Sequence, residues 1–175
     1  IVIGLWFFPF LGGLVIINEK QVGIVIKKFA KSKLPPGRQI ALKNEAGYQA
    51  DTLAPGWHWG YFFWQYNVQK EPMIVIPEGK VGLVIANDGE PIPPERILAK
   101  VVDCDDFQDA RQFLTNGGEK GRQLSILTAG TYRINTALFQ IIDRVNVFAV
   151  EPDKVGIVTT CDGTPIEEEA IAGPI

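Results

Sequence analysis

The fold of this chain is decided by the stretch Gln21-Val22-Gly23-Ile24-Val25-Ile26, because the chain repeats it twice. The second copy is Lys80-Val81-Gly82-Leu83-Val84-Ile85, and the third is Lys154-Val155-Gly156-Ile157-Val158-Thr159. Short runs of Val and Ile are typical of β-strands, and a glycine inside such a run indicates a bulge or a close approach of another segment. We therefore expect three related strands, each opening a small β-unit that packs against its neighbours.

Two further motifs follow the strand motif. The first is a turn, in which Leu34-Pro35-Pro36-Gly37-Arg38 matches Ile92-Pro93-Pro94-Glu95-Arg96, and Asp88-Gly89-Glu90-Pro91-Ile92 matches Asp162-Gly163-Thr164-Pro165-Ile166. The second reads as a turn that enters another strand, and its two copies are Leu53–Trp59 and Leu127–Asn135. The third copy stops before this second motif, which predicts that the chain continues beyond Ile175.

The motifs divide the sequence into four segments and predict an α+β fold in which strands dominate. We expect a membrane anchor at 1–17, a first β-repeat at 18–71, a second β-repeat with a helical insertion at 72–150, and the start of a third, truncated repeat at 151–175. The insertion predicts a helix over Asp105–Leu114, because acids favour a helix N-terminus and the Phe107, Ala110, Phe113 and Leu114 side chains would share one face.

The first 17 residues carry no charged side chain. As a helix at about 1.5 Å per residue they would reach roughly 25 Å, slightly short of a hydrocarbon core of about 30 Å. Three interpretations remain open at this point: a spanning or re-entrant membrane anchor, a cleaved signal peptide, and a buried strand or helix of a soluble core. We expect the anchor, with Trp6, Phe7, Phe8 and Phe10 in the membrane.

A basic run follows this segment, although the net charge of the chain is −3. It includes Lys20, Lys27 and Lys28, which we expect at lipid headgroups. An excess of Lys and Arg beside a membrane segment predicts a cytoplasmic side for the soluble part, and we expect a bacterial inner membrane. Cys104 and Cys161 form neither a disulfide framework nor a metal-ligand spacing, so we expect free buried thiols, no metal and no cofactor.

These motifs resemble the SPFH superfamily, which includes stomatin, prohibitin, flotillin and bacterial relatives. The resemblance rests on the strand Gln21–Val25 and on Leu53-Ala54-Pro55-Gly56-Trp57-His58-Trp59. The run Leu127–Asn135 is similar to that of flotillin-like bacterial members, with Ala129 in place of the usual proline. The resemblance implies a non-enzymatic scaffold that oligomerises into a membrane-attached ring or cage, organises lipid microdomains, and restrains membrane proteins such as proteases. It implies further copies of the chain, or a related SPFH subunit, as partners in the assembly.

An aromatic run is the most distinctive candidate site in the soluble part of the sequence. Membrane insertion, core packing and ligand stacking are all compatible with it, because Trp and Tyr combine an apolar body with a polar tip. We expect a shallow membrane dip, whose members are Trp57, Trp59, Phe62, Phe63 and Trp64. A sequence pI near 5.2 disfavours nucleic acid as a partner.

Catalytic chemistry has little support in the sequence. His58 is the only histidine and stands between two tryptophans, where a structural role is expected. Two other classes of function remain open beside the membrane scaffold: a soluble, vault-like shell of β-repeats, and a membrane-tethered hydrolase that uses Cys104 or Cys161 as its nucleophile.

Overall fold

The computed structural model describes residues 12–159, and β-strands dominate the regular secondary structure within them. Strands make up 41% of these residues and helix 4%. The expectation of an α+β fold is therefore wrong. The described residues contain a single short α-helix, α2 (Ala110–Thr115), and it is too short to form a layer of its own.

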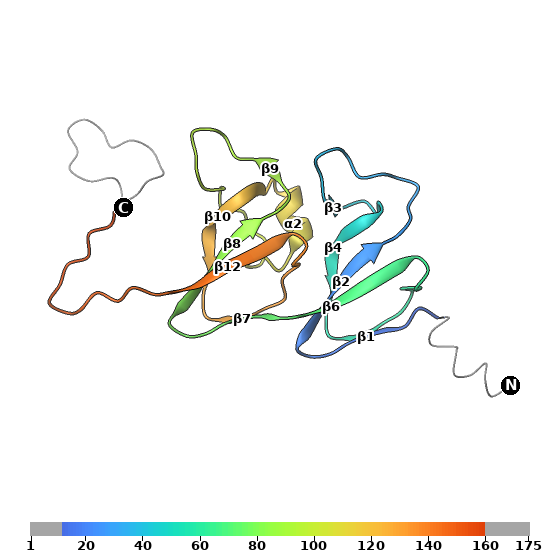
Figure 1. Cartoon of the computed structure of the whole chain (residues 1–175), viewed down its shortest axis with the longest axis horizontal. Helices are drawn as coiled ribbons and strands as arrows, with labels where there is room; N and C mark the ends of the chain where they lie inside the picture. The colour runs from blue at the N-terminus through green and yellow to red at the C-terminus, as the bar shows by residue number, and fades with distance from the viewer. Residues whose placement is uncertain (1–11, 160–175) are drawn as a thin grey trace.

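The strands form two β-units that lie side by side (Figure 1). Those of the first unit are β1 (Val15–Ile17), β2 (Gln21–Lys27), β3 (Ile40–Ala41), β4 (Gly47–Leu53), β5 (Gly56–His58) and β6 (Tyr66–Pro72). Those of the second unit are β7 (Ile74–Ile76), β8 (Lys80–Ala86), β9 (Glu90–Pro91), β10 (Glu119–Leu127), β11 (Gly130–Tyr132) and β12 (Phe139–Asn146).

The two units have the same topology, which agrees with the sequence repeat. The four-stranded sheets have the orders β3-β4-β2-β6 and β9-β10-β8-β12, and the two-stranded sheets pair β1 with β5 and β7 with β11. In each unit a short segment pairs in parallel with the next long strand: β3 does so in the first unit, and β9 and a bridge between Ala99 and Gln123 do so in the second. The central strand β2 or β8 pairs antiparallel on both sides. Each of the first two Val-Gly motifs thus forms the central strand of its unit.

The glycine of the motif allows a close approach between the two sheets of each unit. A Cβ added to Gly23 would lie 2.9 Å from Ile17 Cδ1, and one added to Gly82 would lie 2.9 Å from Ile76 Cδ1. Ile17 and Ile76 end the first strand of their respective units, β1 and β7, and both are buried. The expected close approach is confirmed for the first two copies of the motif.

The helical insertion differs from the expectation. Asp105, Asp106 and Phe107 have φ values of 52°, 50° and 64°, which lie in the left-handed region and exclude a right-handed helix there. The helix α2 begins only after Asp109, whose carboxylate accepts from the Gln112 amide at 2.8 Å as an N-cap. The four apolar side chains of this insertion are nevertheless all buried, as predicted: Phe107, Ala110, Phe113 and Leu114.

The apolar segment 1–17 does not act as one element. Residues 1–11, with Trp6, Phe7, Phe8 and Phe10, lie outside the described residues, whereas β1 belongs to the first β-unit and Ile17 is part of its core. Between residues 12 and 159 no helix has the length and apolar character needed to cross a bilayer. The expectation of a membrane segment over 1–17 is therefore corrected: its last three residues are a strand of a folded sheet.

The third Val-Gly copy also differs from the expectation of a strand. Residues 154–159 have no strand partner among the described residues, and Val155, Ile157 and Val158 are all highly exposed. Residues 160–175, which include Cys161, lie outside the described part of the chain.

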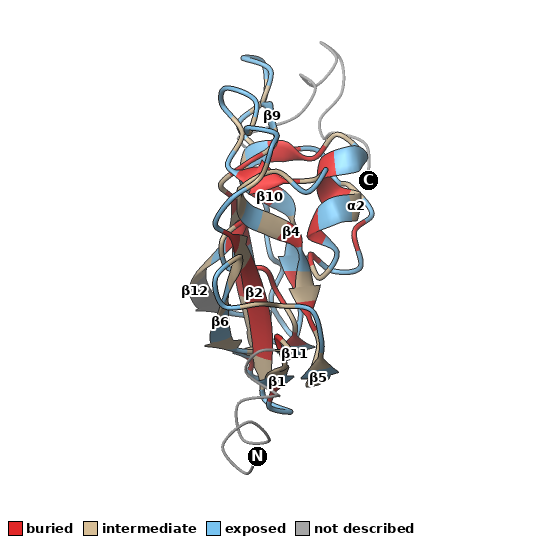
Figure 2. Ribbon diagram, turned by 90° about the vertical axis from the view of Figure 1, so that its right-hand side faces the viewer, coloured by how far each residue is buried: buried red, intermediate tan, exposed pale blue. Residues whose placement is uncertain are grey.

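The two units share one hydrophobic core. Ile40 and Ala50 of the first unit are buried together with Val84, Phe113 and other apolar side chains of the second. Figure 2 shows buried residues along β2, along part of β10 and on one face of α2. The units therefore form a continuous structure rather than two separate domains.

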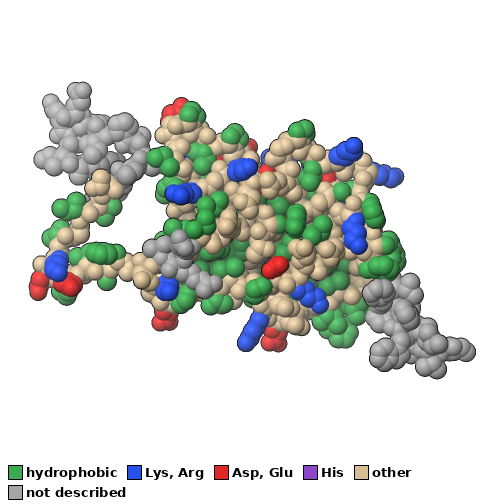
Figure 3. All heavy atoms as spheres, viewed as in Figure 1, with side chains coloured by type: hydrophobic (Ala, Val, Ile, Leu, Met, Phe, Trp, Pro, Cys, Tyr) green, Lys and Arg blue, Asp and Glu red, His purple; other side chains and the backbone are tan. Residues whose placement is uncertain are grey.

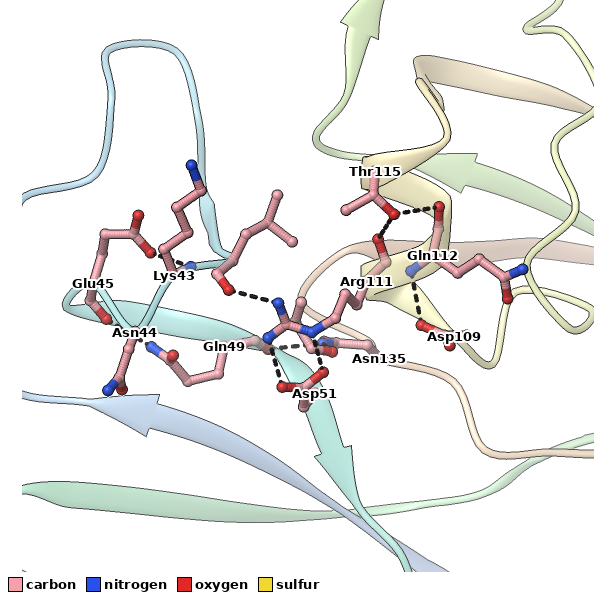
Figure 4. A network of polar contacts seen from close by, with 12 residues as sticks. Lys43, Asn44, Glu45, Gln49, Asp51, Asp109, Arg111, Gln112, Thr115 and Asn135 are labelled. Carbon is pink, nitrogen blue, oxygen red and sulfur yellow. Dashed lines mark hydrogen bonds and ion pairs between the residues drawn. The ribbon is translucent and has the colours of Figure 1, made fainter.

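Polar contacts reinforce this junction (Figure 4). Asn135 of the second unit donates through Nδ2 to the carbonyl oxygens of Gln49 and Ala50, both at 3.0 Å. Arg111 of α2 forms a two-point ion pair with Asp51 of β4, at 2.8 and 2.6 Å, and donates to the Leu42 carbonyl. The second unit thus bonds to the backbone of β4 as well as packing on it.

Candidate functional site

The predicted aromatic run forms the loop between β5 and β6, at one end of the first unit. The β5 strand that leads into it pairs with β1, which places Trp57 beside Ile16. The Tyr61 amide donates to the Gly13 carbonyl at 3.0 Å, and the Gln65 and Tyr66 amides both donate to the Phe62 carbonyl. The backbone of the loop is therefore held in place, and its side chains are presented in a defined arrangement.

Large apolar side chains at this end of the molecule point into solvent. Trp57 is 71% exposed and Trp59 56%, and Phe63 and Trp64 are each nearly half exposed. We call the exposed set the aromatic end, and its members are Ile16, Phe29, Trp57, Trp59, Phe63 and Trp64. Figure 3 shows hydrophobic side chains gathered at the right-hand end of the first unit.

The aromatic rings of the loop contact one another. Phe62 stacks on Trp64 with ring centroids 4.8 Å apart, and Phe63 meets Trp64 edge to face at 5.1 Å. Phe62 is only half buried, so the loop presents a small packed ring cluster rather than isolated side chains. Such a cluster stays exposed at a cost in free energy unless another apolar phase covers it.

Lysines border the aromatic end. Lys28 donates through Nζ to the Phe63 carbonyl at 2.7 Å, and its own amide donates to the Gln65 carbonyl. Lys28 and Lys70 line one hollow together with Phe63, and Lys20 lines another hollow together with Trp57. The three side chains combine positive charge with exposure beside an apolar surface.

Lys27 is buried, unlike these three lysines, although we expected it at lipid headgroups from the sequence. Its side chain is only 7% exposed, and Nζ donates to the side-chain and backbone oxygens of Asn44 at 2.7 and 3.1 Å. Nζ also lies over the Tyr66 ring, 5.9 Å from its centroid. Lys27 thus has a structural role inside the first unit, and we leave it out of the lipid-facing set.

The second unit provides an internal control for the aromatic end. At the corresponding positions the second unit has Thr131 for Trp57, Arg133 for Trp59, Thr136 for Phe63, Ala137 for Trp64 and Asp88 for Phe29. The same backbone therefore folds with small or polar side chains at these positions. The fold of a β-unit therefore does not by itself require large aromatic side chains at these positions.

The other candidate residues from the sequence, His58 and Cys104, lie in environments that indicate structural roles. His58 Nε2 lies 2.7 Å from the Ala54 carbonyl oxygen, and Tyr132, at the corresponding position of the second unit, donates to the Thr128 carbonyl at 3.0 Å. Cys104 is a free, buried thiol, and burial raises its pKa, which disfavours the nucleophilic thiolate. Within residues 12–159 no group of His, Cys, Asp and Glu side chains is arranged to hold a metal ion.

A polar hollow lies where the two units meet, and no pattern in the sequence predicts it. Asp51, Asp105 and Asp109 line it together with Arg133. Two of these carboxylates are already engaged, because Asp51 pairs with Arg111 and Asp109 caps α2. The arrangement resembles a structural junction more than a binding site.

Sequence reasoning missed two members of the aromatic end. Ile16 was assigned to the apolar leader, and Phe29 was hidden within the basic run. Alignment of the repeats offers a signal for Phe29, because the second and third copies both have aspartate at that position, Asp88 and Asp162. In comparisons with known proteins, no family model, curated protein or solved structure matches this chain.

Proposed function

We propose that this protein is a non-enzymatic, membrane-associated scaffold whose aromatic end lies in the headgroup region of a bilayer. The observation that carries the proposal is the contrast between the units: the same loop is aromatic and exposed in the first and small or polar in the second. Trp favours the membrane interface, because its ring is apolar and its indole N–H still finds polar partners there.

The charges around the aromatic end support a lipid surface as its partner. Lys20, Lys28 and Lys70 flank the aromatic side chains and would meet anionic headgroups when the rings enter the interface. Each such lysine adds about 1 kcal/mol of attraction to an anionic leaflet. A neutral carbohydrate would stack on the same rings but has no charge for the lysines to meet. The acidic sequence pI near 5.2 disfavours a nucleic acid. This arrangement favours the cytoplasmic leaflet as the surface that is bound.

The scaffold part of the proposal rests on the repeated unit. The edge strands β6 and β12 each pair on one side only within the described sheets, so both units offer a sheet edge to further copies. The resemblance to the SPFH superfamily points the same way, to homo-oligomers that organise a membrane microdomain and restrain membrane proteins such as proteases. In this proposal the first unit contacts lipid and the second extends away from it.

The proposal is tested by grafting residues of the second unit onto the first. The variant Trp59→Arg/Phe63→Thr/Trp64→Ala carries the side chains that the second unit has at 133, 136 and 137. Co-sedimentation with vesicles of phosphatidylcholine and phosphatidylserine should weaken at least about tenfold, because three large apolar side chains are lost. A control variant, Leu124→Ser/Ile126→Ser, removes exposed apolar side chains of the second unit and should bind as the wild type does.

Equal vesicle binding by the grafted and the unchanged protein would overturn the membrane part of the proposal. The scaffold part has a separate test, the native mass of the detergent-extracted protein. Large assemblies are expected, and a monodisperse monomer would contradict them. Large assemblies without vesicle binding would favour the alternative of a soluble shell.

A further inference from the structure

One hollow of the first unit gathers positive charge beside the aromatic end. It has a volume of about 510 Å³, and Ile16 of β1 and Val68 and Lys70 of β6 are among the residues that line it. Lys28 and Phe63 line it as well. Ile16 and Phe63 also belong to the aromatic end, so the hollow lies close to the side chains that the proposed function places in the membrane interface.

The positive charge of this hollow has no compensating acid. None of the residues that line it is acidic, and within residues 12–159 neither Lys28 nor Lys70 forms an ion pair with a carboxylate. Lys28 Nζ donates to the Phe63 carbonyl at 2.7 Å, which uses one of its three N–H donors. The hollow beside Lys20 differs, because Glu19 lines it too. The excess of positive charge therefore indicates an anionic ligand.

The hollow also has hydroxyl groups that can donate hydrogen bonds. Tyr61 and Tyr66 both line it, and neither hydroxyl has a hydrogen-bond partner in the part of the chain that the structure describes. Their rings pack edge to face with centroids 5.4 Å apart, which holds both side chains in place. Burial raises the pKa of Tyr61, so its hydroxyl stays protonated. Ammonium and hydroxyl groups together match the acceptor oxygens of a phosphate group.

The two lysines enter the hollow from opposite ends. The Lys28 amide donates to the Gln65 carbonyl, so Lys28 lies level with Gln65, whereas Lys70 is five residues further along the chain. At a strand rise of about 3.4 Å per residue, their backbones lie roughly 17 Å apart. Two lysine side chains that reach toward each other over this distance leave room for one anionic group between them. A phosphomonoester, with a charge of about −1.5 to −2 at pH 7, would match both lysines, whereas a carboxylate would match only one.

The charge and one of the hydroxyl groups are particular to the first unit. From the matching hydrogen bonds and strand pairs, the second unit has Asn87 at the position of Lys28 and Phe139 at the position of Tyr66. Phe139 is 1% exposed and belongs to the shared core. The fold of a β-unit thus accepts an uncharged side chain and a plain phenyl ring at these two positions.

The size and the apolar side of the hollow favour a phosphate that is attached to a lipid. A volume of about 510 Å³ is much larger than a single phosphate group. Val15, Ile16 and Val68 give the hollow an apolar side, which would contact the glycerol and the first acyl carbons of a lipid. A soluble phosphate ion has no group that would cover these side chains.

From this arrangement we infer that the hollow binds the phosphomonoester headgroup of an anionic lipid between Lys28 and Lys70. The inference rests on the proposed function, because the headgroup reaches the hollow only when the aromatic end lies in the membrane interface. It goes beyond that function by naming one class of lipid, in addition to the general attraction of lysines to an anionic leaflet.

Vesicle binding to two anionic lipids at equal surface charge tests this inference. One set of vesicles contains phosphatidic acid, a phosphomonoester, and the other contains phosphatidylserine, with the amounts adjusted to the same zeta potential. The wild type should bind the first set about tenfold more tightly, because the phosphomonoester accepts more charge-assisted hydrogen bonds. Lys70→Gln should bind both sets equally. Lys20→Gln loses the same charge outside this hollow, so this matched control should keep the preference.

Equal binding of both sets by the wild type would overturn the inference and leave the proposed function in place. The same preference in Lys70→Gln as in Lys20→Gln would also overturn it. A failure to bind either set would overturn the proposed function as well.

A separate measurement distinguishes a lipid from a soluble phosphate. Millimolar inorganic phosphate should leave the preference of the wild type unchanged, because a lipid in the bound vesicle is present at a high effective concentration. Loss of the preference at this concentration of phosphate would overturn the lipid as the ligand and assign the hollow to a soluble phosphate.

Discussion

Gly23 and Gly82 occupy the same position in two β-units: a Cβ added to either glycine would lie 2.9 Å from the Cδ1 atom of an isoleucine at the end of the unit's first strand. The isoleucines are Ile17 and Ile76, and both are buried. This correspondence places the two Val-Gly motifs in one structural frame. It also identifies the contact that makes glycine necessary at the centre of each sheet.

Different atoms surround the two glycines, so we predict that substitution by alanine lowers the free energy of unfolding by a different amount at each. In Gly23→Ala the new methyl group would also lie 2.9 Å from Leu53 Cβ, which cannot move without the backbone. In Gly82→Ala the only contact below 3.0 Å is the flexible end of Ile76. We expect Gly23→Ala to destabilise the protein by about 1–3 kcal/mol and Gly82→Ala by less, measured by urea unfolding.

A second substitution separates these two cases. Ile76→Val removes the clashing Cδ1 and should restore most of the stability lost in Gly82→Ala. Ile17→Val should restore little in Gly23→Ala, because the contact with Leu53 remains. A larger loss of stability in Gly82→Ala than in Gly23→Ala would contradict this account. Equal recovery of stability by Ile17→Val and Ile76→Val would contradict it as well.

The junction between the units should depend on Asn135 far more than on Arg111. Asn135 is fully buried, and Asn135→Ala leaves the Gln49 and Ala50 carbonyls without their donor, so we expect a loss of about 2–3 kcal/mol. Arg111→Ala breaks the exposed ion pair with Asp51 and should cost only about 0–1 kcal/mol. Thermal and urea unfolding of both variants measure the difference, and a larger loss in Arg111→Ala would refute this ranking.

Glu119 should make the stability of the second unit depend on pH. Burial raises the pKa of this carboxyl, but hydrogen bonds from Arg96 and the Lys100 amide outweigh it and hold the pKa below its ordinary value. The unfolded chain therefore binds the proton more readily. The contribution of Glu119 is complete above a pH of about 4.5 and is lost as the pH falls through the lower pKa of the folded state.

Urea unfolding at a series of pH values from about 7 down to about 3 measures this effect. Glu119→Gln should be less stable than the wild type at neutral pH and should lose less stability on acidification. Glu95→Gln, at an exposed acid of the same unit, should follow the wild-type pH dependence. Parallel curves for Glu119→Gln and the wild type would show that Glu119 is not the source of the dependence.

The lysines at the aromatic end should control the salt dependence of vesicle binding. In Lys20→Gln/Lys70→Gln the affinity for vesicles that contain phosphatidylserine should fall by about 1 kcal/mol per lysine at low salt. The difference should shrink as salt screens the remaining charge. Lys120→Gln, on the second unit, is the control and should bind as the wild type does. Equal losses from Lys120→Gln and from the double variant would indicate a non-specific charge effect.

Much of the fold could be predicted from the repeat, because each Val-Gly motif is local and carries its own turn chemistry. The errors arose where tertiary contacts overrode local pattern. Asp105 and Asp106 look like the first turn of a helix, but their left-handed backbone leads Phe107 into the core instead. The residues Val15–Ile17 look like part of an apolar leader, but their pairing with β5 makes them a strand.

The candidate site was only partly visible in the sequence for a similar reason. The aromatic run could be found because its residues are contiguous in the sequence. Whether these side chains are packed in the core or exposed could not be predicted, because both arrangements use the same residue types. Lys27 was misplaced because a lysine in a basic run is usually exposed, and its partner Asn44 is 17 residues away. Asp88 of the second unit accepts from the Gln39 and Ile40 amides of the first. This contact could not be predicted from the sequence, because backbone amides occur at nearly every residue.

The central claim is tested most directly by the fluorescence of the tryptophans at the aromatic end. The chain has four tryptophans, so Trp6→Phe leaves only Trp57, Trp59 and Trp64 as emitters. With vesicles of anionic lipid, we predict a blue shift and strong quenching by bromine atoms on the upper acyl carbons. Emission that stays at the wavelength of water-exposed tryptophan, unquenched at saturating lipid, would contradict the account.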